Sequence, residues 1–146
     1  MKEQFSRTAQ LLGNENVEKL FDKHVIVFGV GGVGGYVVEA LARSGVGKIS
    51  IVDNDVVNES NINRQIIALH STVGMQKVEV LKNRILDINP ECQVFVYNQF
   101  FLPENSKDFD FSIYDYVVDA VDTVTAKIEI IKKSKESNVP VISSMG

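Results

Sequence analysis

The stretch VIVFGVGGVGGYVVEALARSGVGKISIVD, residues 25–53, predicts a strand, a glycine-rich turn, a helix and a second strand. Its first part, Val25–Phe28, is wholly apolar, which is typical of a parallel strand buried on both faces. Apolar side chains then recur at helical spacing through residues 33–44, and a second expected buried strand, Ile49–Val52, completes the unit. A strand, a helix and a strand in this order indicate an α/β fold with a parallel sheet.

The turn in this unit has the spacing of a nucleotide-binding motif. Gly29, Gly31 and Gly34 match G-x-G-x-x-G, and Asp53 follows about 20 residues later, where such motifs place a ribose ligand. Residues without a Cβ let the backbone turn tightly and approach a phosphate, whose charge the following helix N-terminus stabilises. We therefore expect a nucleotide site, with Asp53 as a ribose ligand rather than a cap or loop carboxylate. The glycines alone do not identify the nucleotide.

The remainder of the chain continues the same pattern. Helices are expected at 75–88 and 125–137, a short helix at Gln65–His70, and further strands at Gln93–Tyr97, Tyr116–Ala120 and Val139–Ser143. Strands that alternate with helices predict a Rossmann-like, doubly wound, mainly parallel sheet with helices on both faces. We divide the chain into an N-terminal helical segment, 1–22, and a nucleotide-binding domain, 23–146, and expect it to be part of a longer protein.

Composition predicts a soluble cytoplasmic domain. The 146 residues suffice for one domain with a proper core, and the net charge of −4 argues against a dedicated nucleic-acid-binding protein. Charged residues in the N-terminal segment exclude a signal peptide, and the longest uncharged run, Val25–Val38, is too short to span a membrane. The single cysteine, Cys92, fits a reducing compartment and excludes an internal disulfide or a cysteine zinc site.

The polar stretch Asn54–Gln76 follows the second strand, at the edge where open α/β sheets bind ligands. Within it, Asn61 and Arg64 have the spacing of two residues on one face of a helical turn. Arg64 is either an ordinary surface arginine or a ligand for an anion, such as the 2′-phosphate of NADP or a triphosphate. Asp55 either assists Asp53 or is simply solvated.

Three further charged residues have both an ordinary and a functional interpretation. Lys77 begins a helix, where the helix dipole disfavours a cation, so it is either solvated or paired with an anionic partner. Asp122 follows the fourth strand in DAVDT; it either caps the next helix or holds Mg²⁺ near phosphates, and the spacing alone favours the cap. Arg7, taken alone, is expected to be a solvated surface residue.

Several segments together resemble the ThiF-type, ubiquitin-activating-enzyme-like superfamily of ATP-dependent adenylating enzymes. The resemblance extends over nearly the whole chain and rests on FSRT at 5–8, GVGGVGG at 29–35, DNDVVNESNINRQ at 53–65, VGMQKVEVLKNRILDINP at 73–90 and DAVDT at 119–123. Within the superfamily, FSRT, NINRQIIAL and the absence of zinc-binding cysteines are most similar to the bacterial tRNA threonylcarbamoyladenosine dehydratases.

The resemblance implies roles that the residues alone leave open. The glycines of the turn would shape it against ATP, Asp53 would bind the ribose, and Asp122 would hold Mg²⁺. The turn glycines in question are Gly29, Gly31, Gly32 and Gly34. Asn61, Arg64 and Lys77 would contact the phosphates, and Asp55 and Gln65 would also belong to the nucleotide site. Arg7 would reach the ATP of the other protomer in a homodimer.

The chemistry implied by the resemblance is ATP-dependent activation of a carboxylate as an acyl adenylate, with release of pyrophosphate. In the dehydratases the carboxylate belongs to threonylcarbamoyladenosine in tRNA, and ring closure expels AMP without a cysteine nucleophile. One alternative is adenylation of a ubiquitin-like sulfur-carrier protein, in a system with a cysteine desulfurase. Others are an NAD(P)-dependent oxidoreductase domain and a non-catalytic nucleotide-sensing domain.

Overall fold

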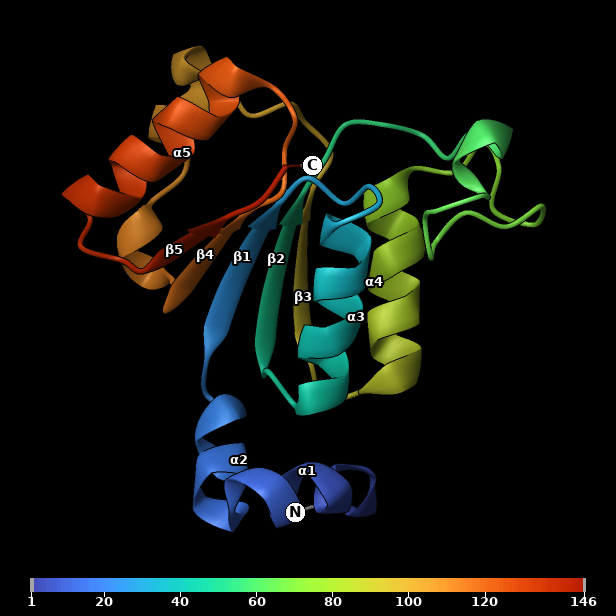
Figure 1. Cartoon of the computed structure of the whole chain (residues 1–146), viewed down its shortest axis with the longest axis vertical. Coiled ribbons are helices and arrows are strands. Elements are labelled where there is room, and N and C mark those ends of the chain that lie inside the picture. The colour runs from blue at the N-terminus through green and yellow to red at the C-terminus, as the bar shows by residue number, and fades with distance from the viewer. Residues whose placement is uncertain (1, 146) are drawn as a thin grey trace.

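Five parallel strands form the centre of the computed structural model, which describes residues 2–145 (Figure 1). Their order across the sheet is β3-β2-β1-β4-β5, and every neighbouring pair is parallel. The strands are β1 (His24–Phe28), β2 (Lys48–Val52), β3 (Gln93–Tyr97), β4 (Tyr116–Asp119) and β5 (Val141–Ser143). The predicted doubly wound sheet is confirmed. Met1 and Gly146, the outer ends of the two segments expected from the sequence, lie outside the described residues.

Helices cover both faces of the sheet, and a separate hydrophobic core lies beneath each layer. The helices α3 (Gly34–Ser44) and α4 (Lys77–Ile88) pack on one face, and α5 (Val124–Glu136) packs on the other (Figure 1). In β1, Val25 and Val27 belong to the first core, whereas Ile26 and Phe28 belong to the second. Successive strand residues point to opposite faces, so a strand buried on both sides must be apolar throughout.

The strand order places a crevice at the carboxyl end of β1. The chain crosses from β1 to β2 on one side and later returns to β4 on the other side of β1. The connections therefore leave β1 and β4 in opposite directions, and the loops above them separate. Open α/β sheets bind ligands at this switch point.

Two short helices, α1 (Ser6–Leu12) and α2 (Asn14–Leu20), lie beyond the amino ends of the strands, at the bottom of Figure 1. They share a small core with the preceding Phe5. Gly47 joins this segment to the sheet, because its N–H donates to Leu20 O at 3.0 Å. None of the helices in residues 2–145 has the length and hydropathy needed to cross a bilayer.

The predicted short helix at Gln65–His70 is wrong. This segment forms a series of turns, and Thr72 explains why. The Thr72 hydroxyl donates to Ile67 O at 2.7 Å and accepts from the Leu69 N–H at 2.9 Å. Side-chain bonds of this kind satisfy backbone groups that a helix would otherwise pair.

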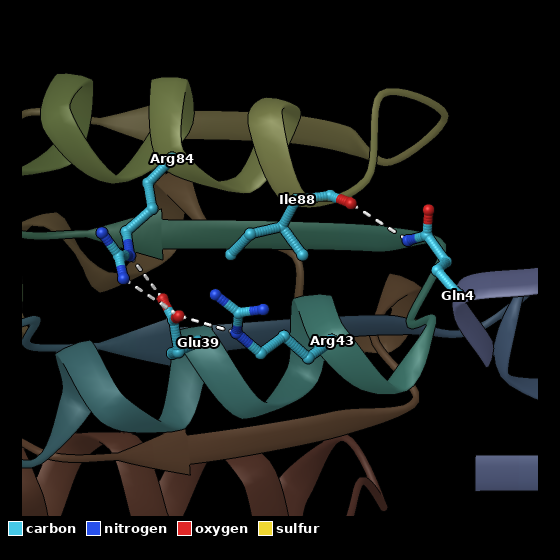
Figure 2. Close-up of polar contacts among 5 residues, drawn as sticks. All are labelled: Gln4, Glu39, Arg43, Arg84 and Ile88. Carbon is cyan, nitrogen blue, oxygen red and sulfur yellow. Dashed lines mark hydrogen bonds and ion pairs between the residues drawn. The ribbon is translucent and has the colours of Figure 1, made fainter. Parts of the chain in front are cut away.

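A charged bridge joins α3 to α4 on the first face of the sheet (Figure 2). The Glu39 carboxylate accepts from Arg84 Nε at 2.5 Å and Nη2 at 3.1 Å, and from Arg43 Nε at 2.8 Å. Glu39 is largely buried, and the hydrogen bond from Arg84 is the main reason why the pKa of its carboxyl lies below the ordinary value. Nearby, the Gln4 amide donates to Ile88 O at 3.0 Å and ties the N-terminal segment to the end of α4.

The bridge predicts a pH-dependent stability. Because the folded-state pKa of Glu39 is lowered, its stabilisation is present above the ordinary carboxyl pKa of 4.5 and is lost as pH falls through the lowered pKa. We expect Glu39→Gln to reduce the free energy of unfolding at pH 7 by about 1–2 kcal/mol, allowing for the partial exposure of Arg84. Urea denaturation at several pH values measures the difference, which should shrink on acidification. Glu15→Gln, which breaks only the exposed Glu15–Lys19 pair, is the matched control and should change stability little.

Candidate functional site

A pocket of about 530 Å³ opens at the carboxyl ends of β1, β2 and β4. It is the crevice that the strand order creates. The residues predicted from the sequence that line it are Gly29, Gly31, Gly32, Asp53, Asp55, Asn61, Arg64, Gln65, Lys77 and Asp122. Gly34 does not line the pocket but begins α3 directly behind the turn. Four separate segments of the chain therefore contribute predicted residues to one cavity.

The glycine turn is built on two very close backbone approaches. Gly29 has φ +85°, and a Cβ at this position would lie 2.6 Å from Ala120 O. A Cβ on Gly34 would lie 1.7 Å from Gly29 O. Both neighbours are backbone atoms that cannot rotate away, so only glycine fits. The turn is consequently pressed against the segment that follows β4.

Asp53 fixes the other side of the turn. One carboxylate oxygen accepts from the Val30 N–H at 2.9 Å, and the other accepts from the Asp55 N–H at 2.8 Å. The side chain is partly exposed at the pocket, so its remaining lone pairs face the cavity. A carboxylate held in this way can accept hydrogen bonds from a diol, as a ribose ligand requires.

Asn61 and Gln65 are polar side chains buried beside the turn. Asn61 is 7% exposed, and its Oδ1 accepts from the Asn58 N–H at 2.9 Å, which closes the short 3-10 turn Glu59–Asn61. Gln65 is also 7% exposed, and its Oε1 is the one buried side-chain polar atom without a hydrogen-bond partner in residues 2–145. A buried acceptor without a partner is costly unless a ligand satisfies it.

Two cationic side chains reach the pocket: Lys77 forms a long ion pair with Asp55, and Arg64 has no ion-pair partner among the described residues. Lys77, at the start of α4, is 4% exposed, and its ammonium lies 3.7 Å from Asp55 Oδ2, too far for a hydrogen bond. Arg64 is exposed, and its Nη1 donates to two neutral oxygens, Ser60 O at 3.1 Å and Asn63 Oδ1 at 2.8 Å. A buried ammonium beside an exposed guanidinium is an arrangement suited to an anion with several oxygens.

Asp122 does not cap the helix that follows it, so the interpretation favoured by spacing alone is wrong. The N-cap of α5 is Thr123, whose side chain makes no capping bond, and Asp122 stands one residue before it with an exposed side chain at the pocket. No cluster of three or more His, Cys, Asp or Glu side chains in residues 2–145 is able to hold a metal ion alone. A single exposed carboxylate such as that of Asp122 fits Mg²⁺, which takes one or two carboxylates and completes its shell with phosphates and water.

The pocket also contains residues that the motifs do not indicate. The segment after β3 contributes Gln99, Phe100 and Phe101, of which Phe100 is 43% exposed and Phe101 is buried in the second core. The two phenylalanines give one side of the cavity an apolar surface. The signal available in the sequence is their position, because β3 ends at the same edge of the sheet as β1 and β2.

Arg7 is not brought to this pocket. It lies exposed on α1, beyond the amino ends of the strands and thus at the opposite end of the molecule (Figure 1). Within one protomer it therefore has no contact with the site.

The close approach of Gly29 predicts a large effect of a single methyl group. Gly13 offers a matched control, because it has the same φ of +85°, yet a Cβ added there would have none of the described residues within 4 Å beyond its own chain neighbours. We expect Gly13→Ala to lower the free energy of unfolding by about 1–3 kcal/mol, the cost of its backbone conformation alone. Gly29→Ala should cost about 1–3 kcal/mol more than Gly13→Ala, because its methyl group also meets Ala120 O. Equal losses in urea denaturation would contradict this account of the turn.

The chain is similar in sequence and fold to several known proteins. The tRNA threonylcarbamoyladenosine dehydratase of Bacillus subtilis is 50% identical over 147 residues, covering 100% of this chain and 58% of that protein. The crystal structure of Escherichia coli tRNA N6-threonylcarbamoyladenosine dehydratase, TcdA, in complex with ATP has a TM-score of 0.95 and 41% identity, covering 99% of this chain and 59% of that one. A probable molybdopterin-synthase adenylyltransferase of Porphyra purpurea is 35% identical, covering 85% of this chain and 32% of that protein. The chain thus spans less than two thirds of these relatives. Residues 5–146 match the ThiF family, and the chain belongs to it.

Proposed function

We propose that this chain binds Mg·ATP and transfers its adenylyl group to a substrate carboxylate. The observation that carries the proposal is the convergence of Arg64, Lys77 and Asp122 on the glycine turn, in a single pocket. A dinucleotide cofactor would use the glycines and Asp53, and NADP would also use Arg64, but Lys77 and Asp122 would be left without a role. A triphosphate with its metal gives a role to each of them.

The chain's residues would act mainly by position and charge. The substrate carboxylate oxygen attacks the α-phosphorus, the bond to the bridging oxygen breaks, and pyrophosphate leaves with that electron pair. Arg64 and Lys77 would bind phosphate oxygens and stabilise the charge that develops on them. Asp122 would hold Mg²⁺, which supplies further neutralisation of the phosphates when it is bound. Asp53 would orient the ribose.

The acceptor that we propose is the carboxylate of threonylcarbamoyladenosine in tRNA. A nucleophilic atom of the same threonylcarbamoyl side chain then attacks the adenylated carboxyl carbon, which closes a ring and expels AMP. The modified nucleoside thereby loses one water overall. This route requires no thiol, and the chain has none to offer: Cys92 is 3% exposed, and burial raises the pKa of its thiol to about 11. A protonated, buried cysteine is a poor nucleophile. The names of the dehydratases described above support the same acceptor.

A second candidate acceptor is the C-terminus of a ubiquitin-like sulfur-carrier protein, within a cysteine desulfurase system. The similarity to the molybdopterin-synthase adenylyltransferase favours it. Supplying the protein with Mg·ATP and either acceptor separates the two. Pyrophosphate release that depends on threonylcarbamoyladenosine-containing tRNA supports the dehydratase. Release that depends only on a sulfur carrier assigns the chain to the other branch.

We further propose a cytoplasmic homodimer in which Arg7 serves the site of the second copy. Its place on α1, exposed and remote from its own pocket, leaves it free to reach a neighbouring molecule. The reduced Cys92 fits the cytoplasm.

The roles of the two cations predict a loss of ATP affinity. Arg64→Met and Lys77→Met should each weaken Mg·ATP binding about tenfold to hundredfold, because each removes charge-assisted hydrogen bonds to phosphate. Isothermal titration calorimetry measures the dissociation constants. Lys82→Met on the same helix α4, outside the pocket, is the control and should bind as the unmodified protein does. Tight NADH binding without Mg·ATP binding would overturn the proposal.

The role of Arg7 in trans predicts complementation between two inactive variants. Arg7→Ala and Lys77→Met should each abolish most of the tRNA-dependent pyrophosphate release. Mixing them in equal amounts should restore about a quarter of the original rate, because half of the random dimers are mixed and each has one intact site. Mixtures that stay inactive after verified subunit exchange would exclude this role.

A further inference from the structure

A hydrogen-bonded ion pair lies buried next to the pocket without lining it. Asp119, the last residue of β4, is 0% exposed, and Lys127 in α5 is 9% exposed. Lys127 Nζ donates to Asp119 Oδ2 at 3.1 Å. Charges are rarely buried unless they are paired and hydrogen-bonded, because leaving water is so unfavourable. The role of this pair therefore needs an explanation.

The pair joins three elements at one point. Lys127 Nζ also donates to the carbonyl oxygen of Ser144, just beyond β5. Asp119 Oδ2 accepts a second hydrogen bond from Ser143 Oγ at 2.6 Å, and the Ser144 N–H donates to Asp119 O at 2.9 Å. The ends of β4 and β5 and the second turn of α5 are thus held together by one ammonium and one carboxylate.

The second oxygen of Asp119 holds the segment that forms the wall of the pocket. Asp119 Oδ1 accepts from the Val121 N–H at 3.2 Å. The preceding Ala120 is fixed to β1, because its N–H donates to Phe28 O at 2.8 Å. Ala120, Val121, Asp122 and Thr123 all line the pocket, and Thr123 makes no side-chain cap. The carboxylate of Asp119 is therefore the side chain that sets the course of this segment.

We propose that Lys127 is a positioning residue for Asp122, acting through the Asp119 carboxylate and the Val121 amide. This inference rests on the proposed function. Without the ammonium, the Asp119 carboxylate would be buried without a countercharge and would turn toward water. Its bond to the Val121 N–H would be lost, and Asp122 would no longer be held at the phosphates.

The test compares two ligands that differ in their need for the metal. AMP uses the turn and Asp53 but not the metal-bearing carboxylate, whereas Mg·ATP uses all of them. Lys127→Met should weaken Mg·ATP binding about tenfold to hundredfold, as expected when the support of a metal ligand is removed, and should leave AMP binding nearly unchanged. A merely structural role would weaken both ligands equally. Lys132→Met, the same substitution at an exposed position of α5, is the control.

Two further variants keep the inference testable if Lys127→Met does not fold. Lys127→Arg preserves the charge and should restore most of the Mg·ATP affinity. Ser143→Ala removes one donor to Asp119 without changing any charge, and it should weaken Mg·ATP binding by a smaller factor than Lys127→Met while leaving AMP binding unchanged. In a double-mutant cycle, Asp122→Asn with Lys127→Met should bind Mg·ATP no more weakly than Asp122→Asn alone.

The outcomes separate the inference from the proposed function. If the unmodified protein does not bind Mg·ATP, the proposed function fails, and the inference fails with it. If the unmodified protein binds Mg·ATP and the folded variants bind it equally well, or if the double variant shows additive losses, only the role of Lys127 is overturned.

Discussion

The contact between the glycine turn and the end of β4 is the constraint on which the pocket depends. Gly29 approaches Ala120 so closely that no side chain fits between them, and the Ala120 N–H in turn binds Phe28 O at the end of β1. The turn and the segment 120–123 are therefore two walls of one cavity whose separation is fixed by backbone atoms. Backbone approach of this kind tolerates less adjustment than contact between flexible side chains.

The charges of the pocket explain why a metal belongs to the proposed reaction. Three carboxylates line the cavity, those of Asp53, Asp55 and Asp122, against the two cations Arg64 and Lys77. A triphosphate would bring several more negative charges into this setting, and the two cations alone would not offset them. A divalent ion between Asp122 and the phosphates would turn the repulsion between these negative groups into attraction. The acidity of the site thus accounts for the place of Mg²⁺ in the proposed reaction.

The sequence predicts the sheet well because a strand buried on both faces must be largely apolar, as Val25–Phe28 is throughout and Ile49–Val52 is except for Ser50. It predicts Gln65–His70 badly because a single hydroxyl, that of Thr72, decides the local hydrogen bonding. Spacing misjudged Asp122, because α5 begins at Val124 and its N-cap is therefore Thr123, one residue beyond Asp122. The contact of Asp119 with Lys127 depends on where α5 packs, which no local pattern encodes. That Gln99 and Phe100 line the pocket likewise depends on the position of β3 in the sheet, which is not a local property of the sequence.

The site takes its parts from both hydrophobic cores, and each core supplies a different kind of group. The segment that carries Asn61, Arg64 and Lys77 is anchored to the α3–α4 face, with Val57, Ile67 and Val78 in its core. The acidic wall with Asp122 and the aromatic wall with Phe101 are anchored to the α5 face. Phe28 at the end of β1 packs against Phe101, with ring centroids 4.7 Å apart, and also lines the pocket. The two cations and Asp122 thus rest on opposite sides of β1, and a phosphate chain bound across its end, as we propose, would be held between two independently packed supports.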